Sequence, residues 1–190
     1  MIMDINKLIA TRRAVYPIQF KEGDIGEASI AQLLENATMA PTHRMTQPWF
    51  FKVYKNSPKD NLGKEMVKAF KKNNPGDTKT DFKEKKIIDK CGITNCIIGI
   101  FMKRSTKVSI PEWEEIAAVA MAVQNIWLSS VEHQIGCYWS SPQYMKHMHS
   151  FFNLNDDERC MGFMYLGKFD HSTLTVKERI KIEEKVDWLV

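Results

Sequence analysis

The sequence of 190 residues predicts an α+β fold in one domain, with a central mixed or mostly antiparallel sheet flanked by helices. Three observations predict this class. Helical and extended patterns alternate along the whole chain. The apolar run 96–102 has the length and continuity of a buried central strand. The stretch 111–133 has the length of a long helix whose centre is apolar on nearly every face.

The N-terminal part is expected to hold two helices, a loop and a strand. Asp4 is a suitable cap for a short helix through residue 10, and the proline at the end of 11–17 favours an extended path there. Apolar residues three and four apart predict an amphipathic helix at 27–39. A loop bracketed by prolines follows at 41–48, and aromatic and β-branched residues then predict a strand at 49–54.

The middle of the chain is rich in lysine. Helices are expected at 57–72 and 81–90. Twelve lysines, no arginine and six acidic residues lie between Lys52 and Lys90, so this stretch carries a formal charge of +6 in a chain of net charge +4. A solvated helical surface is favoured, and an anion-binding face is the alternative. We expect the segment 56–90 to be the most mobile part of the domain and a candidate lid.

The long helix is the strongest single feature. Pro111 is expected as its first residue and Gly136 as its C-terminal cap. From Ile116 to Leu128 the helix is apolar on nearly every side, and such a helix is normally buried on every side. Burial of that kind would take up most of the core of one small chain. The pattern therefore predicts a central helix that is shared with a second subunit.

The C-terminal part is expected to add a strand at 137–139, a helix at 143–152 and a strong strand at 160–169. The arm 171–190 is charged but ends in apolar residues. An apolar end on a polar arm indicates docking, and a partner chain is the expected surface.

Several kinds of chemistry have no support in the sequence. It contains no glycine-rich dinucleotide or phosphate loop, no HExxH and no GxSxG. His147 and His149 face different directions on the expected helix, so no metal site is expected. The cysteines form no CxxC pair, and we interpret them as buried free thiols in a reducing cytoplasm. They are Cys91, Cys96, Cys137 and Cys160.

Location and macromolecular partners are constrained in the same way. The N-terminus lacks the pattern of a signal peptide, and no apolar run reaches roughly 18 residues. A cytoplasmic protein without a membrane span is expected. The lysine-rich stretch lacks the arginines that read base edges, so no nucleic-acid partner is expected.

Three segments are chemically unusual: Arg12–Arg13, the loop 41–48 and Trp139–Ser141. A flavin mononucleotide needs cations for its phosphate, amide-like groups for its pyrimidine edge and flat apolar walls for its ring system. The arginine pair has the first kind of group, the loop residues His43, Arg44 and Gln47 the second, and the tryptophan with its two serines the third. Each segment also has an ordinary alternative: surface arginines, a polar loop and a core tryptophan.

These segments resemble those of the nitroreductase family, in particular its short members. The resemblance is carried in order by TRRAVYP, APTHRMTQPWFFKVY, PEWEEIAAVAMAVQNIWLSSVEHQIGCYWSS and MGFMYLGKFD, and it covers about residues 5–170. The piece from Ala40 to Trp49 is the most specific. The resemblance implies a nitroreductase-like fold, FMN as cofactor, NADH or NADPH as reductant, and an entwined homodimer with shared flavin sites.

The resemblance also implies particular flavin contacts. Arg12 would hold the phosphate, and the loop would reach the flavin of the partner chain. The last segment would line the ring, with a backbone N–H facing flavin N5. The stretch 129–134 corresponds to a region tied to nicotinamide binding. The residues implied to bind the cofactor are Arg12, Arg13, Ala14, His43, Gln47, Trp139, Ser140 and Ser141.

The sequence departs from the family pattern at two positions. A serine commonly follows the arginine pair, with a basic residue two positions later; Ala14 and Tyr16 stand there in this chain. Loss of the hydroxyl removes one hydrogen bond, worth about 0.5–1.5 kcal/mol net. Lys168 and Arg179 are the cations that could compensate at the phosphate.

The resemblance favours an FMN-dependent oxidoreductase that passes hydride from NADH or NADPH through flavin N5 to a small electron-poor acceptor, nitroaromatic or quinone-like, in ping-pong order. The cofactor supplies the chemistry, so no catalytic side chain is assigned. One alternative is a specialised flavin enzyme with a narrow substrate, closed by the lysine-rich segment. Another is a non-enzymatic anion-binding module that uses the Lys52–Lys90 face, which predicts no flavin and a steep salt dependence.

Overall fold

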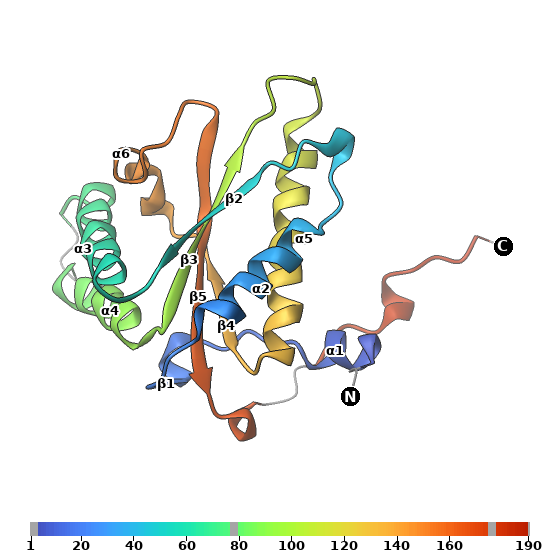
Figure 1. Cartoon of the computed structure of the whole chain (residues 1–190), viewed down its shortest axis with the longest axis horizontal. Coiled ribbons are helices and arrows are strands. Elements are labelled where there is room, and N and C mark those ends of the chain that lie inside the picture. The colour runs from blue at the N-terminus through green and yellow to red at the C-terminus, as the bar shows by residue number, and fades with distance from the viewer. Residues whose placement is uncertain (1–3, 77–79, 175–177, 190) are drawn as a thin grey trace.

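The computed structural model describes residues 4–76, 80–174 and 178–189, and it confirms the α+β class (Figure 1). The α-helices are α1 (Ile5–Thr11), α2 (Glu27–Thr38), α3 (Asn56–Asn73), α4 (Thr80–Ile93), α5 (Glu112–Glu132) and α6 (His149–Phe152). The strands are β1 (Phe20–Lys21), β2 (Trp49–Tyr54), β3 (Cys96–Lys103), β4 (Gly136–Ser140) and β5 (Glu158–Phe169). Short 3₁₀ helices are η1 (Pro17–Gln19), η2 (His43–Met45), η3 (Gln143–His147), η4 (His171–Thr173) and η5 (Ile182–Glu184).

The strands form one five-stranded sheet, and every pairing among the described strands is antiparallel. The order is β1-β5-β3-β2, with β4 also paired to β5. The sequence left a mixed sheet open, and the structure has only antiparallel ladders. β2 lies in register on β3, with Trp49 opposite Met102 and Tyr54 opposite Ile97. β4 pairs with β5 from Gly136 opposite Gly167 to Ser140 opposite Phe163, so β5 positions the strand that carries one of the candidate site segments.

Helices cover both faces of the sheet. In Figure 1, α2 and α5 lie on one side of the strands, and α3, α4 and α6 lie on the other. β3 is buried along its whole length except at Lys103. Side chains on the two faces of this strand pack into different cores. Ile98 and Ile100 belong to the core under α5, and Ile97 and Phe101 belong to the core under α3 and α4. This double burial is the reason for the continuous apolar run in the sequence.

The long helix α5 buries only one face in a single chain. Val119, Ala122 and Ile126 are fully buried against α2 and the sheet. The side chains of Trp113 and Met121, on another face, are 66% and 38% exposed. The helix was expected to be buried on every side. Within a single chain only one face is buried, and a second apolar stripe is exposed at the surface.

Three local expectations were wrong. Pro111 is the N-cap of α5 and not its first helical residue. Gly136 does not cap α5, because Gln134 takes the left-handed conformation with φ +55° and the glycine begins β4. A Cβ at Gly136 would lie 3.0 Å from Phe20 and Val15, so close packing explains this glycine. The helix expected at 143–152 breaks at Met148 into η3 and α6, because the buried Met148 side chain holds the kink against the core.

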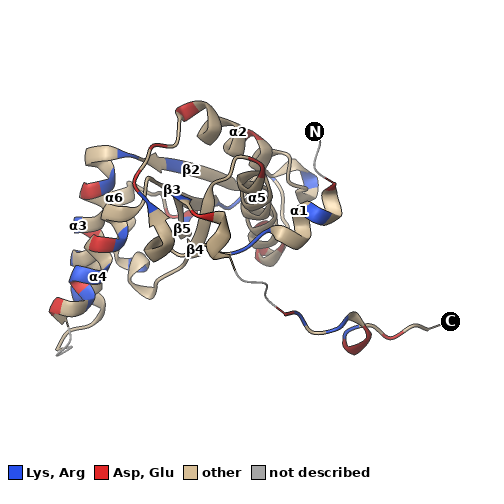
Figure 2. Ribbon diagram, turned by 90° about the horizontal axis from the view of Figure 1, so that it is seen from below, with Lys and Arg blue, Asp and Glu red and all other residues tan. Residues whose placement is uncertain are grey.

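The lysine-rich segment and the C-terminal arm differ in how they attach. α3 and α4 pack on the sheet through Leu62, Met66 and Ile87, and the mobility expected of this segment stays a prediction. The arm 178–189 extends away from the body of the domain (Figures 1 and 2), and near its end Trp188 is 81% exposed. Across the described residues, no helix combines the length and apolar character needed to cross a membrane.

Gly167 offers a test of the packing between β1 and β5. A Cβ at Gly167 would lie 2.2 Å from the Cγ of Phe20, which is buried, so the ring and β1 would have to move. Gly167→Ala should lower the free energy of unfolding by about 1–3 kcal/mol, measured by urea denaturation.

The matched control is Gly92→Ala in α4. A Cβ there meets nothing within 4 Å. Since alanine is the better helix former by about 0.8–1.0 kcal/mol, this variant should be neutral or stabilised. Equal losses in both variants would contradict the packing argument.

Candidate functional site

The segment from Arg12 to Ala14 lies beside the beginning of β4. The Val15 N–H donates to the carbonyl of Cys137 at 3.0 Å, which ties the segment to the strand. The indole Nε1 of Trp127, on α5, donates to the carbonyl of Arg13 at 3.0 Å. A partly buried indole N–H needs an acceptor, and here the acceptor is the arginine segment itself. Sheet and long helix together therefore fix the path of residues 12–15.

The two arginines of this segment have different surroundings. The guanidinium of Arg13 donates to the carbonyls of Ala10 at 2.5 Å and of Arg12 at 2.9 Å, so it serves the end of α1. The guanidinium of Arg12 lies over the Trp127 ring, 4.9 Å from its centroid. Arg12 is thus stacked on an aromatic surface and keeps its donors for another group.

Positive charge gathers around Arg12. Burial lowers the pKa of Arg12, and the charges of Arg179 and Arg13 lower it further. Arg179 comes from the C-terminal arm. The charges of Arg13 and Arg179 act unfavourably on that of Arg12, and an anion bound to Arg12 would offset this repulsion. Lys168, the other cation considered from the sequence, lies instead beside Gly23, with its Cγ 3.1 Å from the ideal Cβ position of that glycine.

The segment Trp139–Ser141 lies at the other end of β4. Trp139 is opposite Met164 on β5, and its Nε1 donates to the carbonyl of Met161 at 3.3 Å. Gly162 makes this approach possible: its φ is +126°, and a Cβ there would lie 2.6 Å from the Ser140 oxygen. Ser140 is partly exposed and Ser141 is exposed, so both can meet a ligand. β4 therefore joins a cationic end and a Trp-Ser-Ser end along one strand.

Two tyrosines occupy the space beside this strand. The rings of Tyr16 and Tyr138 lie 4.8 Å apart between centroids, and Tyr138 is 6.2 Å from Tyr165. Sequence reasoning missed Tyr138 and Trp127. Alternation along β4 would have placed Tyr138 on the face opposite Trp139. For Trp127, the available sign was an indole N–H donor within the apolar centre of the long helix.

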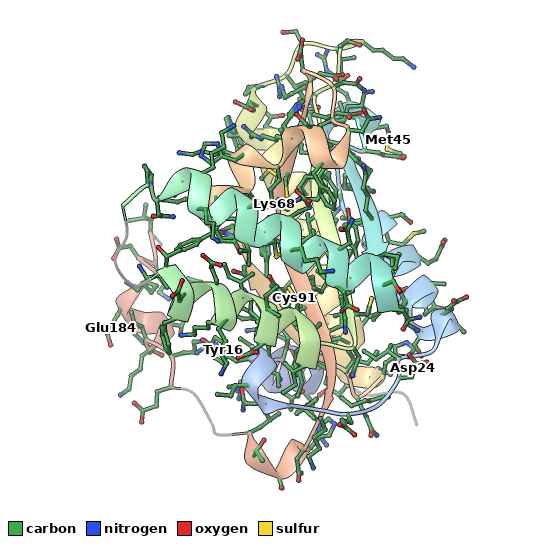
Figure 3. All side chains as sticks on the ribbon, turned by 90° about the vertical axis from the view of Figure 1, so that its left-hand side faces the viewer. Tyr16, Asp24, Met45, Lys68, Cys91 and Glu184 are labelled. Carbon is green, nitrogen blue, oxygen red and sulfur yellow. The ribbon has the colours of Figure 1, made fainter. Side chains whose placement is uncertain are left out.

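The loop 41–48 lies elsewhere, at the beginning of α5. His43 Nδ1 contacts a carboxylate oxygen of Glu114. The Thr42 hydroxyl lies 3.0 Å from that of Thr46 and accepts from the Gln47 N–H at 3.1 Å. A shallow hollow of about 370 Å³ adjoins the loop, with His43 and Glu114 in its wall. In Figure 3, Met45 of this loop lies at the opposite end of the molecule from Tyr16.

A single chain thus brings together two of the three segments. The third is separated from them by most of α5: Trp113, near His43, and Trp127, beneath Arg12, are about 21 Å apart along a helix that rises about 1.5 Å per residue. Within one chain, His43 and Gln47 therefore lie far from Arg12.

In the stretch 129–134, the two serine hydroxyls form hydrogen bonds within the chain. The Ser129 hydroxyl accepts from Asn36 at 2.8 Å and donates to the carbonyl of Asn125 at 2.7 Å. The Ser130 hydroxyl is buried and donates to the carbonyl of Trp127 at 2.8 Å. These contacts join α2 to α5 and leave neither serine hydroxyl directed to a nicotinamide. Across the described ranges, no three His, Cys, Asp or Glu side chains lie together as metal ligands would.

The cysteines are placed for packing. Cys91, Cys96 and Cys137 are buried, Cys160 is partly buried, and all four are free thiols. Burial raises the pKa of Cys91 to about 11 and the pKa values of Cys96, Cys137 and Cys160 to about 12. A thiol with so high a pKa is not a thiolate nucleophile near neutral pH.

The cysteine thiols should not react with thiol reagents in the folded chain. At pH 8, an aromatic disulfide reagent should release little colour from native protein and should report all four cysteines after unfolding in guanidinium. Because the pKa values are raised on folding, the thiols favour the folded state below about pH 9. Their contribution should disappear as pH rises toward 11–12, and the free energy of unfolding should fall over that range. Rapid reaction of any thiol in native protein at pH 8 would contradict the burial argument.

Comparison with known proteins gives one consistent result. The model of the family described as "Nitroreductase family" matches residues 9–168. A curated relative from Bacillus subtilis, "Putative NAD(P)H nitroreductase YfhC", is 28% identical over 185 residues, which are 95% of this chain and 92% of the relative.

Solved structures agree with that match. A nitroreductase-like family protein from Bacillus cereus has a TM-score of 0.87 at 25% identity and covers 100% of this chain and 97% of its own. The FMN-dependent nitroreductase NfnB from Mycobacterium smegmatis, solved in complex with NADPH, has a TM-score of 0.76 at 15% identity, with 96% of each chain covered. The second likeness bears on the fold alone.

Proposed function

The chain belongs to the nitroreductase family, and from this premise we propose that it is an oxidoreductase that binds FMN and is reduced by NADH or NADPH. The observation that carries the proposal is the position of Arg12, stacked on Trp127 beside the beginning of β4, at one end of a strand whose other end is Trp139–Ser141. This arrangement suits an elongated ligand with an anion at one end and a flat ring at the other.

The donor set fits the phosphate of FMN. Arg12 would make the direct contact, because Trp127 orients its guanidinium and no described carboxylate is paired with it. Arg179 would supply a second charge near the phosphate. Ala14 offers no hydroxyl, so the phosphate end would have one hydrogen bond fewer than in relatives with a serine there.

The opposite end of β4 fits the ring system. Trp139 already uses its N–H within the chain, so its indole would serve as a wall. Ser140 and Ser141 would present backbone N–H groups and hydroxyls to the edge of the ring. Bound FMN supplies the redox chemistry, taking hydride from a nicotinamide and passing it to an electron-poor acceptor such as a nitroaromatic or a quinone. The chain's own residues would bind and orient, and none of them is proposed as an acid or base.

A second copy of the chain is proposed to complete the site. The surface stripe of α5 with Trp113 and Met121 is apolar and open, and so is the end of the C-terminal arm. A dimer with these surfaces at its interface would explain why α5 is apolar on nearly every side. His43 and Gln47 would then reach the flavin that is held by Arg12 of the other protomer.

The first experiment is a visible absorption spectrum of purified protein after incubation with FMN and desalting, followed by anaerobic NADH or NADPH. Flavin bands that remain and then bleach are the expected result. Protein that retains no flavin would contradict the proposal and favour the anion-binding module. Retained flavin that neither donor bleaches would contradict the role of the nicotinamide.

Arg12 is expected to dominate flavin affinity. Arg12→Gln removes the stacked charge at the phosphate and should weaken FMN binding roughly tenfold to a hundredfold, since a charge-assisted contact contributes about 1.5–3 kcal/mol. Fluorescence titration of FMN measures this. The control is Lys7→Gln, an exposed charge on α1 that should leave the affinity unchanged. Equal losses in both variants would show a general effect of net charge.

A mixed dimer tests whether the site is shared between protomers. One tagged chain carries Arg12→Gln and a differently tagged partner carries His43→Ala with Gln47→Ala. If each site takes its arginines from one chain and its loop from the other, both defects fall in the same site and the second site is intact. Dimers purified by both tags should then hold about half the flavin of the unmodified dimer. Flavin no higher than in either parent variant would place each site within one chain.

A further inference from the structure

Three acidic residues in the first turn of α5 each contact a different part of the chain. The buried carboxylate of Glu115 pairs with Arg104, which directly follows β3. Glu112 pairs with Arg159 of β5, with 2.7 Å between oxygen and nitrogen. These two contacts tie the beginning of α5 to the end of β3 and to β5. The third carboxylate, that of Glu114, therefore lies on a turn of helix that the sheet holds in place.

Glu114 determines which nitrogen of His43 carries a hydrogen. Its carboxylate contacts Nδ1 of the imidazole ring. An ionised carboxylate can only accept a hydrogen bond, so Nδ1 must be the donor. In a neutral imidazole the other nitrogen, Nε2, is then an acceptor without a hydrogen. The His43 side chain is 51% exposed, and no described residue forms a hydrogen bond with its Nε2. His43 therefore offers one free acceptor at the surface.

The backbone of the loop 41–48 keeps His43 and Gln47 in one short turn. The Thr46 N–H donates to the His43 carbonyl at 3.2 Å, and the Gln47 N–H donates to the Thr42 hydroxyl at 3.1 Å. Gln47 is exposed, and its side-chain amide has no hydrogen-bond partner in the part of the chain that the structure describes. The loop thus presents an imidazole acceptor together with an amide that can donate and accept.

We propose that Glu114 is a positioning residue of the flavin site shared between protomers, and that it makes Nε2 of His43 the acceptor for flavin N3–H. The inference rests on the proposed function, because it assigns a contact in that same site. The pyrimidine edge of an oxidised flavin has a single N–H donor, N3, between two carbonyl oxygens. A nitrogen that only accepts can therefore meet that edge at N3 alone. The donors of the Gln47 amide suit one of the flanking carbonyls.

The first test measures the tautomer of His43 and needs no flavin. Nitrogen-15 NMR of protein labelled at histidine distinguishes the two tautomers, and pH 8.5 lies above the usual titration range of imidazole. His43, assigned by the signal that His43→Gln removes, should carry its hydrogen on Nδ1. Glu114→Ala should lower the population of this form, since no carboxylate then accepts from Nδ1.

The matched control is Glu112→Ala, which removes another carboxylate of the same turn. The partner of Glu112 is Arg159, so the tautomer of His43 should not change. A hydrogen on Nε2 in the unmodified protein, alone or on both nitrogens, would overturn the inference, because that nitrogen would then be a donor. A tautomer that Glu114→Ala leaves unchanged would overturn it as well.

The second test compares FMN with 3-methyl-FMN, in which a methyl group replaces the N3 hydrogen. Fluorescence titration should show that the unmodified protein prefers FMN by about threefold to tenfold, as the loss of one hydrogen bond allows. Glu114→Ala should reduce this preference by about half or more, whereas Glu112→Ala should keep it. If Glu114 only stabilised the loop, its loss would weaken both flavins alike and leave their ratio unchanged, which would contradict the inference.

The two tests separate this inference from the proposed function. Protein that binds neither flavin contradicts the proposed function, and the N3–H contact with it, whatever the tautomer of His43. Protein that binds both flavins in a ratio independent of Glu114 contradicts the contact alone. The expected result is a hydrogen on Nδ1 in the unmodified protein, together with a ratio that depends on Glu114 and not on Glu112.

Discussion

The structure depends first on the burial of the two central strands, β3 and β5, from both sides. A strand that is apolar on both faces needs a helical layer on each, and α2 with α5 and α3 with α4 provide these layers. Once β5 is fixed between them, its outer edge accepts β4, and β4 sets the places of Val15 and Trp139. The sheet therefore positions the candidate site, because the arginine segment and Trp139–Ser141 lie at opposite ends of β4.

The sequence predicted those parts of the molecule that are encoded locally. The period of α2, the continuous apolar run of β3 and the length of α5 each reflect a single element in its own layer, and the structure confirms them. The wrong expectations concern contacts between distant segments. Gly136 is needed because Phe20 and Val15 approach it, and neither contact is visible in the residues around the glycine.

The same distinction applies to the candidate site. The residue types of the arginine pair, the loop and the Trp-Ser-Ser segment were enough to suggest a cofactor with a phosphate and a ring. The roles within the pair were not predictable, because they depend on which guanidinium turns back to the carbonyls of α1 and which stacks on Trp127. The charge of Arg179 acts on Arg12 from the C-terminal arm, and Lys168 lies instead beside Gly23.

The lysine-rich segment divides into two kinds of surface once its contacts are known. On α3, Lys68 pairs with Glu65 at 2.5 Å, and Lys71 pairs with Glu84 of α4 at 3.0 Å. These lysines belong to a solvated face with partners of opposite charge, as Figure 2 also shows by the mixture of blue and red on both helices. Lys86 and Lys90 lack such partners among the described residues and border an apolar hollow between α4 and η1. A single interpretation of the whole segment, whether as surface or as anion site, would therefore miss the difference.

The loop 41–48 gives a physical reason to expect a second molecule. Arg44, Met45 and Gln47 all have positive φ values, of 49°, 54° and 43°, and none of them is a glycine. Such conformations cost of order 1 kcal/mol or more each, and they persist only where surrounding contacts hold them. Here the threonine pair and the His43–Glu114 contact hold them, yet the loop does not approach the arginines of its own chain. A loop kept in a costly shape at the surface is consistent with the proposed site between two protomers. The neighbouring apolar stripe of α5, which is also exposed, supports the same proposal.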